Sequence, residues 1–268
     1  MSVKLQRALR LVLRLALFVG VLVMLVATAL LLRLRDLFSR QPADRVPIAN
    51  GFLHALCAGL GYRVRVEGQP VIDAPVLYVS NHISWTDIPV LLAQTPLRFL
   101  AKKEVGKWPV IGWLAREGGT LFIDRGKGQS GQVRQQIAQA LGDGDSVLVF
   151  PEGTTSDGTG VLPFHGRLLA AAADADVPVQ PITLGYRRRG QPDTIVPFIG
   201  NDDFHRHLWR LLRYPGLEVT VIYHRPRWLQ GGAELGACIE TLQQDVASGL
   251  ARIHQPSALP GSYASARP

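Results

Sequence analysis

The chain has 268 residues, of which 47% are hydrophobic and 19% are charged. This balance excludes an intrinsically disordered chain, and the length is sufficient for one domain with a sizeable core. The formal net charge of +8 favours anionic partners such as phospholipid headgroups, nucleic acid or phosphorylated cofactors, without choosing among them.

The first predicted element is an apolar helix near the N-terminus. Residues Leu15–Leu32 form an uncharged run of 18 residues, and about 20 apolar residues suffice to span a bilayer. Three alternatives remain open: a signal peptide cleaved near Ala27–Ala29, a spanning helix, or a helix that lies in one leaflet. The run is longer than the core of a typical signal peptide, about 7–15 residues. Arginines on both flanks leave its orientation unreadable.

A second apolar segment, Val46–Tyr62, is typical both of a core helix and of a helix lying at a membrane surface. From Tyr62 onward, strand and helix patterns alternate. Strands are predicted over residues 62–67, 75–80, 97–101, 120–123, 146–150, 179–184 and 217–223. Helices are predicted over residues 87–94, 105–116, 131–141, 166–175, 204–213 and 233–254.

This alternation predicts an α/β layered domain with a largely parallel sheet flanked by helices. We therefore divide the chain into an N-terminal membrane-anchoring region (1–61), an α/β domain (62–255) and a flexible tail (256–268) that is rich in Pro, Ser and Ala.

A His and an Asp follow the second predicted strand, where function gathers in such sheets. His82 and Asp87 are five residues apart, so on one helix they would lie on different faces. They meet if His82 precedes the helix and Asp87 lies in its first turn. Thr86 favours a helix start, and Pro89 requires an early position. We therefore predict that Asp87 accepts a hydrogen bond from His82, whose other nitrogen is then free to act as a general base.

The chain has no G-x-S-x-G nucleophile elbow, so this pair indicates that the substrate supplies the hydroxyl. The alternative is a capping Asp beside a structural His. Two further strand ends carry polar groups. Arg125 offers a planar fork for phosphate or carboxylate. Glu152 is placed either to bind the acceptor or to support the His–Asp pair, and Gly153 permits close backbone approach.

Together these segments resemble the glycerophospholipid acyltransferase family, which includes the lysophosphatidic acid acyltransferases. The family's first block is an Asn-His pair and, after four intervening residues, an Asp. Its later blocks are Phe-Ile-Asp-Arg, Phe-Pro-Glu-Gly-Thr and a proline after an apolar strand. The matching residues are Asn81, His82 and Asp87, then Phe122–Arg125, Phe150–Thr154 and Pro181. The ordered combination, over residues 62–223, is far more specific than any single block.

The resemblance implies that His82 deprotonates the acceptor hydroxyl, which attacks the thioester carbonyl of an acyl donor, while Asp87 orients His82. The donor is acyl-CoA or acyl-carrier protein, and no metal or bound cofactor is required. The implied acceptor-binding residues are Arg125, for a phosphate, and Glu152, Gly153 and Thr154. The expected location is the inner or plasma membrane, with the catalytic domain facing the cytoplasm and membrane lipid as a partner.

Two departures from the family pattern concern the acceptor. Many lysophosphatidic acid enzymes carry Arg where this chain has Thr155. Lysines often follow the next Pro-Phe, where this chain has His165–Arg167. The leading expectation is acylation of 1-acylglycerol-3-phosphate to phosphatidic acid. O-acylation of lyso-ornithine lipid, which has no phosphate, is the alternative, and a non-catalytic lipid-binding membrane protein is another.

The remaining candidates are weaker. His165 is a second possible base, and His205 and His207 lack an obvious third metal ligand. The arginines are expected either to bind anionic lipid or donor phosphates, or to form a solvated basic face; they are Arg187–Arg189, Arg206, Arg210 and Arg213. No nucleic-acid-binding motif is present, so a nucleic-acid partner is not expected.

Overall fold

The computed structural model of the chain describes residues 3–41, 43, 45–123, 130–229 and 235–255. Within these residues, eight strands form a sheet in the order β1-β8-β6-β2-β5-β3-β4, with β7 beside β6. Pairing is parallel except where β6 meets β7 and β8. The strands are β1 (Tyr62–Glu67), β2 (Leu77–Ser80), β3 (Arg98–Lys102), β4 (Leu121–Ile123), β5 (Val147–Val149), β6 (Val179–Arg188), β7 (Gln191–Pro192) and β8 (Leu217–Tyr223).

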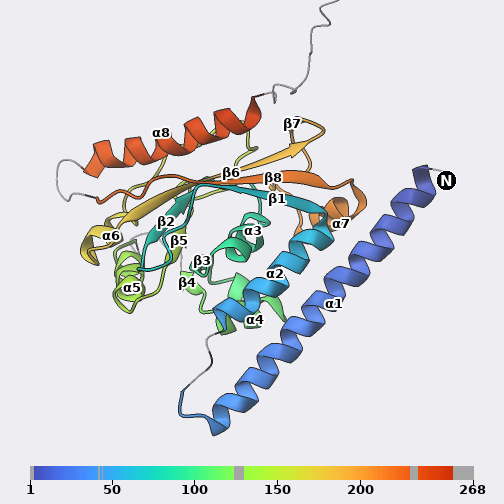
Figure 1. Cartoon of the computed structure of the whole chain (residues 1–268), viewed down its shortest axis with the longest axis horizontal. Coiled ribbons are helices and arrows are strands. Elements are labelled where there is room, and N and C mark those ends of the chain that lie inside the picture. The colour runs from blue at the N-terminus through green and yellow to red at the C-terminus, as the bar shows by residue number, and fades with distance from the viewer. Residues whose placement is uncertain (1–2, 42, 44, 124–129, 230–234, 256–268) are drawn as a thin grey trace, which may run out of the picture.

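Helices cover both faces of the sheet (Figure 1). One core packs α2, α3 and α7 against the sheet, and the other packs α5, α6 and α8. The helices are α1 (Val3–Phe38), α2 (Val46–Leu60), α3 (Asp87–Gln94), α4 (Ile111–Glu117), α5 (Ser130–Gly142), α6 (Ala170–Asp174), α7 (Phe204–Arg213) and α8 (Leu235–His254), with a 3₁₀ turn η1 (Val105–Lys107). The predicted α/β class is confirmed.

Strand β2 shows how the two cores place the His–Asp segment. Leu77 and Val79 enter the core under α5 and α8, whereas Tyr78 enters the core under α2, α3 and α7. A strand with both faces covered is apolar on both, and all of β2 is buried. Its polar continuation at Asn81 therefore emerges inside the protein, at the carboxyl end of a central strand.

The predicted helix over residues 105–116 is wrong in its middle. The segment forms η1, then an interruption, then α4 from Ile111. Pro109 has no N–H to donate and disfavours the helical conformation of the residue before it. Trp108 is accordingly extended, with φ −67° and ψ 132°. Strand β7 was not predicted, and α6 begins at Ala170, four residues after its predicted start.

The N-terminal helix α1 runs along the domain beside α2, α4 and α7 (Figure 1). Among the described residues it is the one helix long and apolar enough to cross a membrane, and its most apolar window is only 11% buried. Arg14 donates to the carbonyl of Tyr214 at 2.6 Å, and Arg33 lies 3.5 Å from Glu117. Polar contacts therefore tie α1 to the domain at two positions that are 19 residues apart.

Candidate active site

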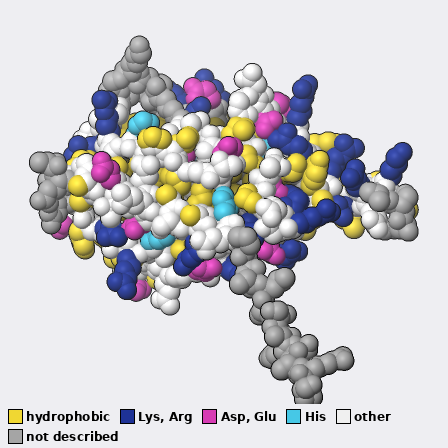
Figure 2. Space-filling view, turned by 90° about the horizontal axis from the view of Figure 1, so that it is seen from above, with side chains coloured by type: hydrophobic (Ala, Val, Ile, Leu, Met, Phe, Trp, Pro, Cys, Tyr) yellow, Lys and Arg dark blue, Asp and Glu magenta, His cyan; other side chains and the backbone are white. Residues whose placement is uncertain are grey.

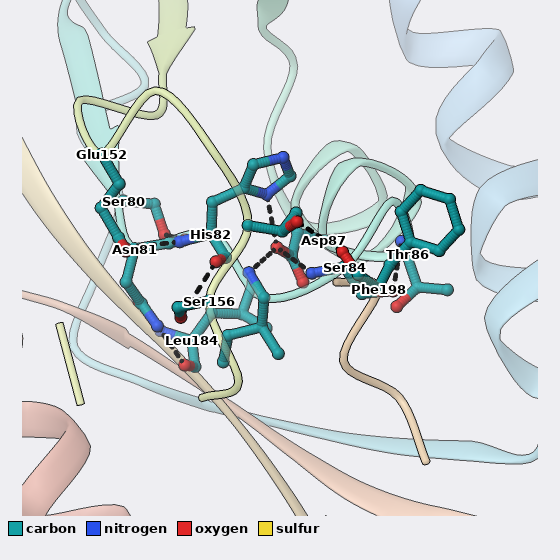
Figure 3. Close-up of polar contacts among 12 residues, drawn as sticks. Ser80, Asn81, His82, Ser84, Thr86, Asp87, Glu152, Ser156, Leu184 and Phe198 are labelled. Atoms are coloured by element: carbon teal, nitrogen blue, oxygen red, sulfur yellow. Dashed lines mark hydrogen bonds and ion pairs between the residues drawn. The ribbon is translucent and has the colours of Figure 1, made fainter. Parts of the chain in front are cut away.

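The loop between β2 and α3 is anchored by Asn81, which is fully buried. Its side-chain amide donates to the carbonyl of Leu184 at 2.8 Å, and its side-chain oxygen accepts from the N–H of Leu184 at 2.8 Å. This two-way pairing with β6 imitates a sheet ladder after β2 has ended. It fixes the backbone at the point where His82 begins (Figure 3).

His82 and Asp87 are in contact, as the spacing predicted. His82 Nδ1 lies 2.7 Å from Asp87 Oδ2, which also accepts from the N–H groups of Ile83 at 2.7 Å and Ser84 at 2.9 Å. Asp87 is the first residue of α3 and is 0% exposed, whereas the His82 side chain is 18% exposed. Because the carboxylate only accepts, Nδ1 carries the proton and Nε2 has the free lone pair. Nε2 points away from Asp87 (Figure 3).

The plane of the His82 ring is set by Phe150, the first residue after β5. The two rings stack with their centroids 3.9 Å apart and an interplanar angle of 13°. An aromatic face on one side and the Asp87 bond at the edge leave the imidazole little rotational freedom. A fixed orientation is what a general base needs, because proton transfer requires hydrogen-bond reach of the reacting hydroxyl.

Glu152 lies in the wall of this site. It is 4% exposed; Oε1 accepts from the N–H of His82 at 2.8 Å, and Oε2 accepts from the N–H of Leu162 at 3.2 Å. Burial raises the pKa of Glu152 to about 7, while these two backbone hydrogen bonds act to lower it. These contacts favour the supporting role for Glu152 over direct binding of the acceptor.

The turn after Glu152 wraps around the His82 backbone. Ser156 donates to the carbonyl of His82 from its N–H at 2.8 Å and from its hydroxyl at 3.2 Å (Figure 3). Gly153 adopts φ +71°, which favours glycine. Gly153 and Thr154 are exposed, and their role in binding the acceptor stays a prediction. His165 is exposed and lies next to Gly153. A Cβ atom built at Gly153 would be 3.7 Å from Cδ2 of His165.

Two other residues of the family pattern are Arg125 and Pro181. Arg125, assigned to an acceptor phosphate by resemblance, lies outside the described residues, so its position is left to experiment. Pro181 is buried in β6, where it is in register with Val79 of β2. Its role in a wall at the strand end stays a prediction.

Three of the weaker candidates, His207, Arg188 and Arg210, form hydrogen bonds or ion pairs with other residues of the protein. His207 is fully buried and accepts from Trp85 Nε1 at 2.9 Å, and burial lowers its pKa. Arg188 pairs with Asp193, and Arg210 pairs with Asp202. Lys and Arg side chains still gather at the end of the molecule where β7 and α7 lie (Figure 2). Among the described residues, no group of three or more His, Cys, Asp or Glu side chains is arranged to hold a metal ion.

Sequence reasoning did not assign roles to three residues that contact the His–Asp segment: Phe150, Ser156 and Tyr186. Phe150 begins the recognised block Phe150–Thr154, and Ser156 lies two residues after its end, but the pattern does not reveal that these two residues touch His82. Tyr186 lies two residues beyond Leu184, the predicted end of its strand. Because side chains alternate along a strand, extending the prediction by two residues would have placed it on the same face as Leu184.

Comparison with known proteins agrees with this geometry. Residues 63–185 match the model of a family described as acyltransferase. These residues include His82, Asp87 and Glu152, and the match ends one residue before Tyr186.

Full-length relatives extend the match. A lyso-ornithine lipid O-acyltransferase of Pseudomonas aeruginosa is 48% identical over 210 residues, covering 76% of this chain and 80% of that protein. A Brucella abortus protein of the same description is 36% identical over 210 residues, covering 73% and 79%. A 1-acyl-sn-glycerol-3-phosphate acyltransferase of Neisseria meningitidis is 33% identical over 179 residues, covering 66% and 68%.

One solved structure shares the fold. The crystal structure of the 1-acyl-sn-glycerophosphate acyltransferase PlsC from Thermotoga maritima superposes with a TM-score of 0.71 at 23% identity. The alignment covers 94% of this chain and 98% of that one, so the correspondence includes the N-terminal helices as well as the sheet.

Proposed function

The chain belongs to the acyltransferase family, and we propose that it transfers a fatty acyl chain from an acyl thioester to the hydroxyl of lyso-ornithine lipid. The observation that carries the reaction is the His82–Asp87 contact, in which Nδ1 is bound to Asp87 and Nε2 points away from it. The acceptor hydroxyl then serves as the nucleophile.

The proposed reaction proceeds through one base. His82 Nε2 removes the proton of the acceptor hydroxyl as its oxygen attacks the thioester carbonyl carbon. Asp87 stabilises the resulting imidazolium through Nδ1. The carbon–sulfur bond breaks as the tetrahedral intermediate collapses, and the imidazolium returns its proton to the departing thiolate. The products are the O-acyl ester and a free thiol, of coenzyme A or of acyl-carrier protein.

The choice of acceptor rests on sequence identity to the relatives and on one residue, Thr155. The 48% identical relative is named for lyso-ornithine lipid, and the 33% identical relative for 1-acylglycerol-3-phosphate. Thr155 stands where many lysophosphatidic acid enzymes carry Arg, and its hydroxyl donates to the carbonyl of Phe198. This side chain is therefore directed at the protein itself, and it supplies no cation for a phosphate. Arg125, which matches the family's Phe-Ile-Asp-Arg block, keeps lysophosphatidic acid as the second candidate.

We expect the purified enzyme to prefer lyso-ornithine lipid over lysophosphatidic acid by about 10- to 100-fold in kcat/KM. A charged hydrogen bond gained or lost is worth about 1.5–3 kcal/mol, which sets that range. The measurement is incorporation of a labelled acyl chain into each acceptor, with acyl-CoA and acyl-carrier protein as alternative donors. Thr155→Arg is the matched variant, and it should narrow the preference.

A preference for lysophosphatidic acid in the wild type would overturn the acceptor assignment and leave the acyltransferase chemistry intact. Turnover of neither acceptor with either donor would overturn the chemistry as well.

We further propose that α1 lies in the cytoplasmic leaflet of the inner or plasma membrane, with the domain facing the cytoplasm, where acyl thioesters are made. Arg14 and Arg33 contact the same domain, and 19 helical residues span about 28 Å. That distance equals most of the hydrocarbon core, about 30 Å thick. A spanning α1 would hold the polar surface of the domain at hydrocarbon depth, at a prohibitive cost.

A membrane-impermeant maleimide tests this placement. Cys238 is partly exposed, whereas Cys57 is buried and burial raises its pKa to about 12, so Cys238 is the reactive thiol. We expect neither Cys238 nor an introduced Lys4→Cys thiol to be labelled in intact cells, and both to be labelled after lysis. Cys238→Ser provides the background. Labelling of only one site before lysis would indicate a spanning α1.

A further inference from the structure

The carboxylate of Asp87 receives donors on both oxygens. Oδ2 takes the three donors described above, whereas Oδ1 accepts from the hydroxyl of Tyr186 at 2.6 Å. Tyr186 lies 99 residues further along the chain, on β6. One side chain from a distant strand therefore completes the environment of the group that orients His82.

Tyr186 is held where its hydroxyl can only donate to Asp87. It is 3% exposed and shares the face of β6 that packs towards α2, α3 and α7. The hydroxyl of Thr86 lies 3.2 Å from the Tyr186 oxygen. Since an ionised carboxylate has no proton to give, the Tyr186 proton goes to Asp87, and Thr86 donates to the Tyr186 oxygen. Burial and the charge of Asp87 raise the pKa of Tyr186 well above its usual value, so the hydroxyl keeps its proton.

We propose that Tyr186 is a positioning residue for acyl transfer: its hydroxyl fixes the rotation of the Asp87 carboxylate and takes up part of its negative charge. This inference rests on the proposed function of the same site. Without the hydroxyl, Oδ1 is a buried acceptor with an unmet hydrogen bond, and only the three donors on Oδ2 still hold the carboxylate.

The charge effect has a definite sign. A hydrogen bond from Tyr186 disperses the carboxylate charge, so the carboxylate attracts the imidazolium less strongly. Removal of that bond concentrates the charge and holds the proton on His82 more tightly. Two other ionisable groups, Glu152 after β5 and Tyr62 on β1, interact electrostatically with Asp87, and Cys57 on α2 and Asp193 after β7 interact with Tyr62. A Tyr186→Phe substitution leaves all four in place.

Tyr186→Phe removes only the hydroxyl oxygen. We expect kcat to fall by about tenfold, KM to change less than about twofold, and the acidic limb of the kcat/KM profile to move to higher pH by about 0.5–1 unit. The pH–rate profile separates this role from a purely structural one, because a loosened core lowers stability without moving the limb. Thermal unfolding of the variant measures that contribution directly.

Tyr62→Phe is the matched control. Tyr62 is also buried and packs edge-on against Tyr186 with ring centroids 6.0 Å apart, but its hydroxyl is not among the described donors to Asp87. This variant should keep kcat within about twofold and leave the pH profile in place. A Tyr186→Phe profile that superposes on the wild type, or an equal shift in Tyr62→Phe, would overturn the inference. An inactive wild type would instead refute the proposed function.

Discussion

Replacement of His82 by alanine is expected to lower kcat by about 10²–10⁴-fold while the protein remains folded. A positioned general base contributes about that much, and the proposed mechanism has no second base to replace it. The side chain is partly exposed at the end of β2, so its truncation removes the stacking on Phe150 but leaves the buried core intact. The measurement is initial-rate acyl transfer, with circular dichroism and thermal unfolding as checks on the fold.

Alanine variants of two other histidines, His165 and His205, serve as controls for His82→Ala. His165 is exposed near Gly153 and is the rival base, whereas His205 is exposed on α7. We expect His205→Ala to keep wild-type kcat and His165→Ala to retain most of it. A His82→Ala protein that turns over at the wild-type rate would exclude His82 as the base. A His82→Ala protein that binds lysolipid, alongside a wild type with no turnover, would identify a lipid-binding protein without catalytic function.

The second large effect is expected from Asp87→Asn, which should lower kcat by about 10²–10³-fold, or about 3–4 kcal/mol of transition-state stabilisation. Three donors converge on the Oδ2 position, namely His82 Nδ1 and the N–H groups of Ile83 and Ser84. An asparagine amide must therefore place its oxygen there and direct its NH₂ group at the Tyr186 oxygen. The orientation of His82 is kept, and what is lost is the negative charge that stabilises the imidazolium.

Asp87→Asn therefore measures the effect of the negative charge of Asp87 on kcat while the orientation of His82 is unchanged. KM for the acceptor should stay close to the wild-type value, because Asp87 is fully buried and does not reach the ligand. Asp87→Ala should cost at least as much and should also destabilise the fold, since it leaves the loop donors without an acceptor. If Asp87→Asn keeps full activity, the charge of Asp87 has no part in the reaction.

The sequence alone predicts the local geometry of the His82–Asp87 pair. The two residues are joined by four others, and Pro89 requires an early position in the helix that begins at Asp87. Thr86 also favours a helix start, although its side chain makes no capping hydrogen bond. The alternation of strands and helices likewise predicts a mostly parallel sheet with its polar residues at strand ends. These features depend on residues that are close together in the sequence, where helix and strand propensities and the period of the hydrophobic pattern are informative.

Long-range contacts at the same site were not predictable in this way. Glu152 lies 70 residues from His82, and the sequence left it either to bind the acceptor or to support the His–Asp pair. The structure adds that both of its oxygens accept from backbone N–H groups. No local pattern indicates which backbone donors a carboxylate meets after β5 has taken its place beside β2. The helix predicted over residues 105–116 was wrong for a local reason instead, because Pro109 has no N–H to donate and disfavours a helical Trp108.

The sequence by itself determined that a His–Asp pair lies at the carboxyl end of a buried strand, because His82 and Asp87 are only five positions apart in the chain. Only the tertiary structure decided what surrounds the pair. The order β6-β2-β5 brings Tyr186 to Asp87 from one side and Glu152 and Phe150 to His82 from the other. Strand order depends on the packing of both cores at once, and this is a property of the whole chain.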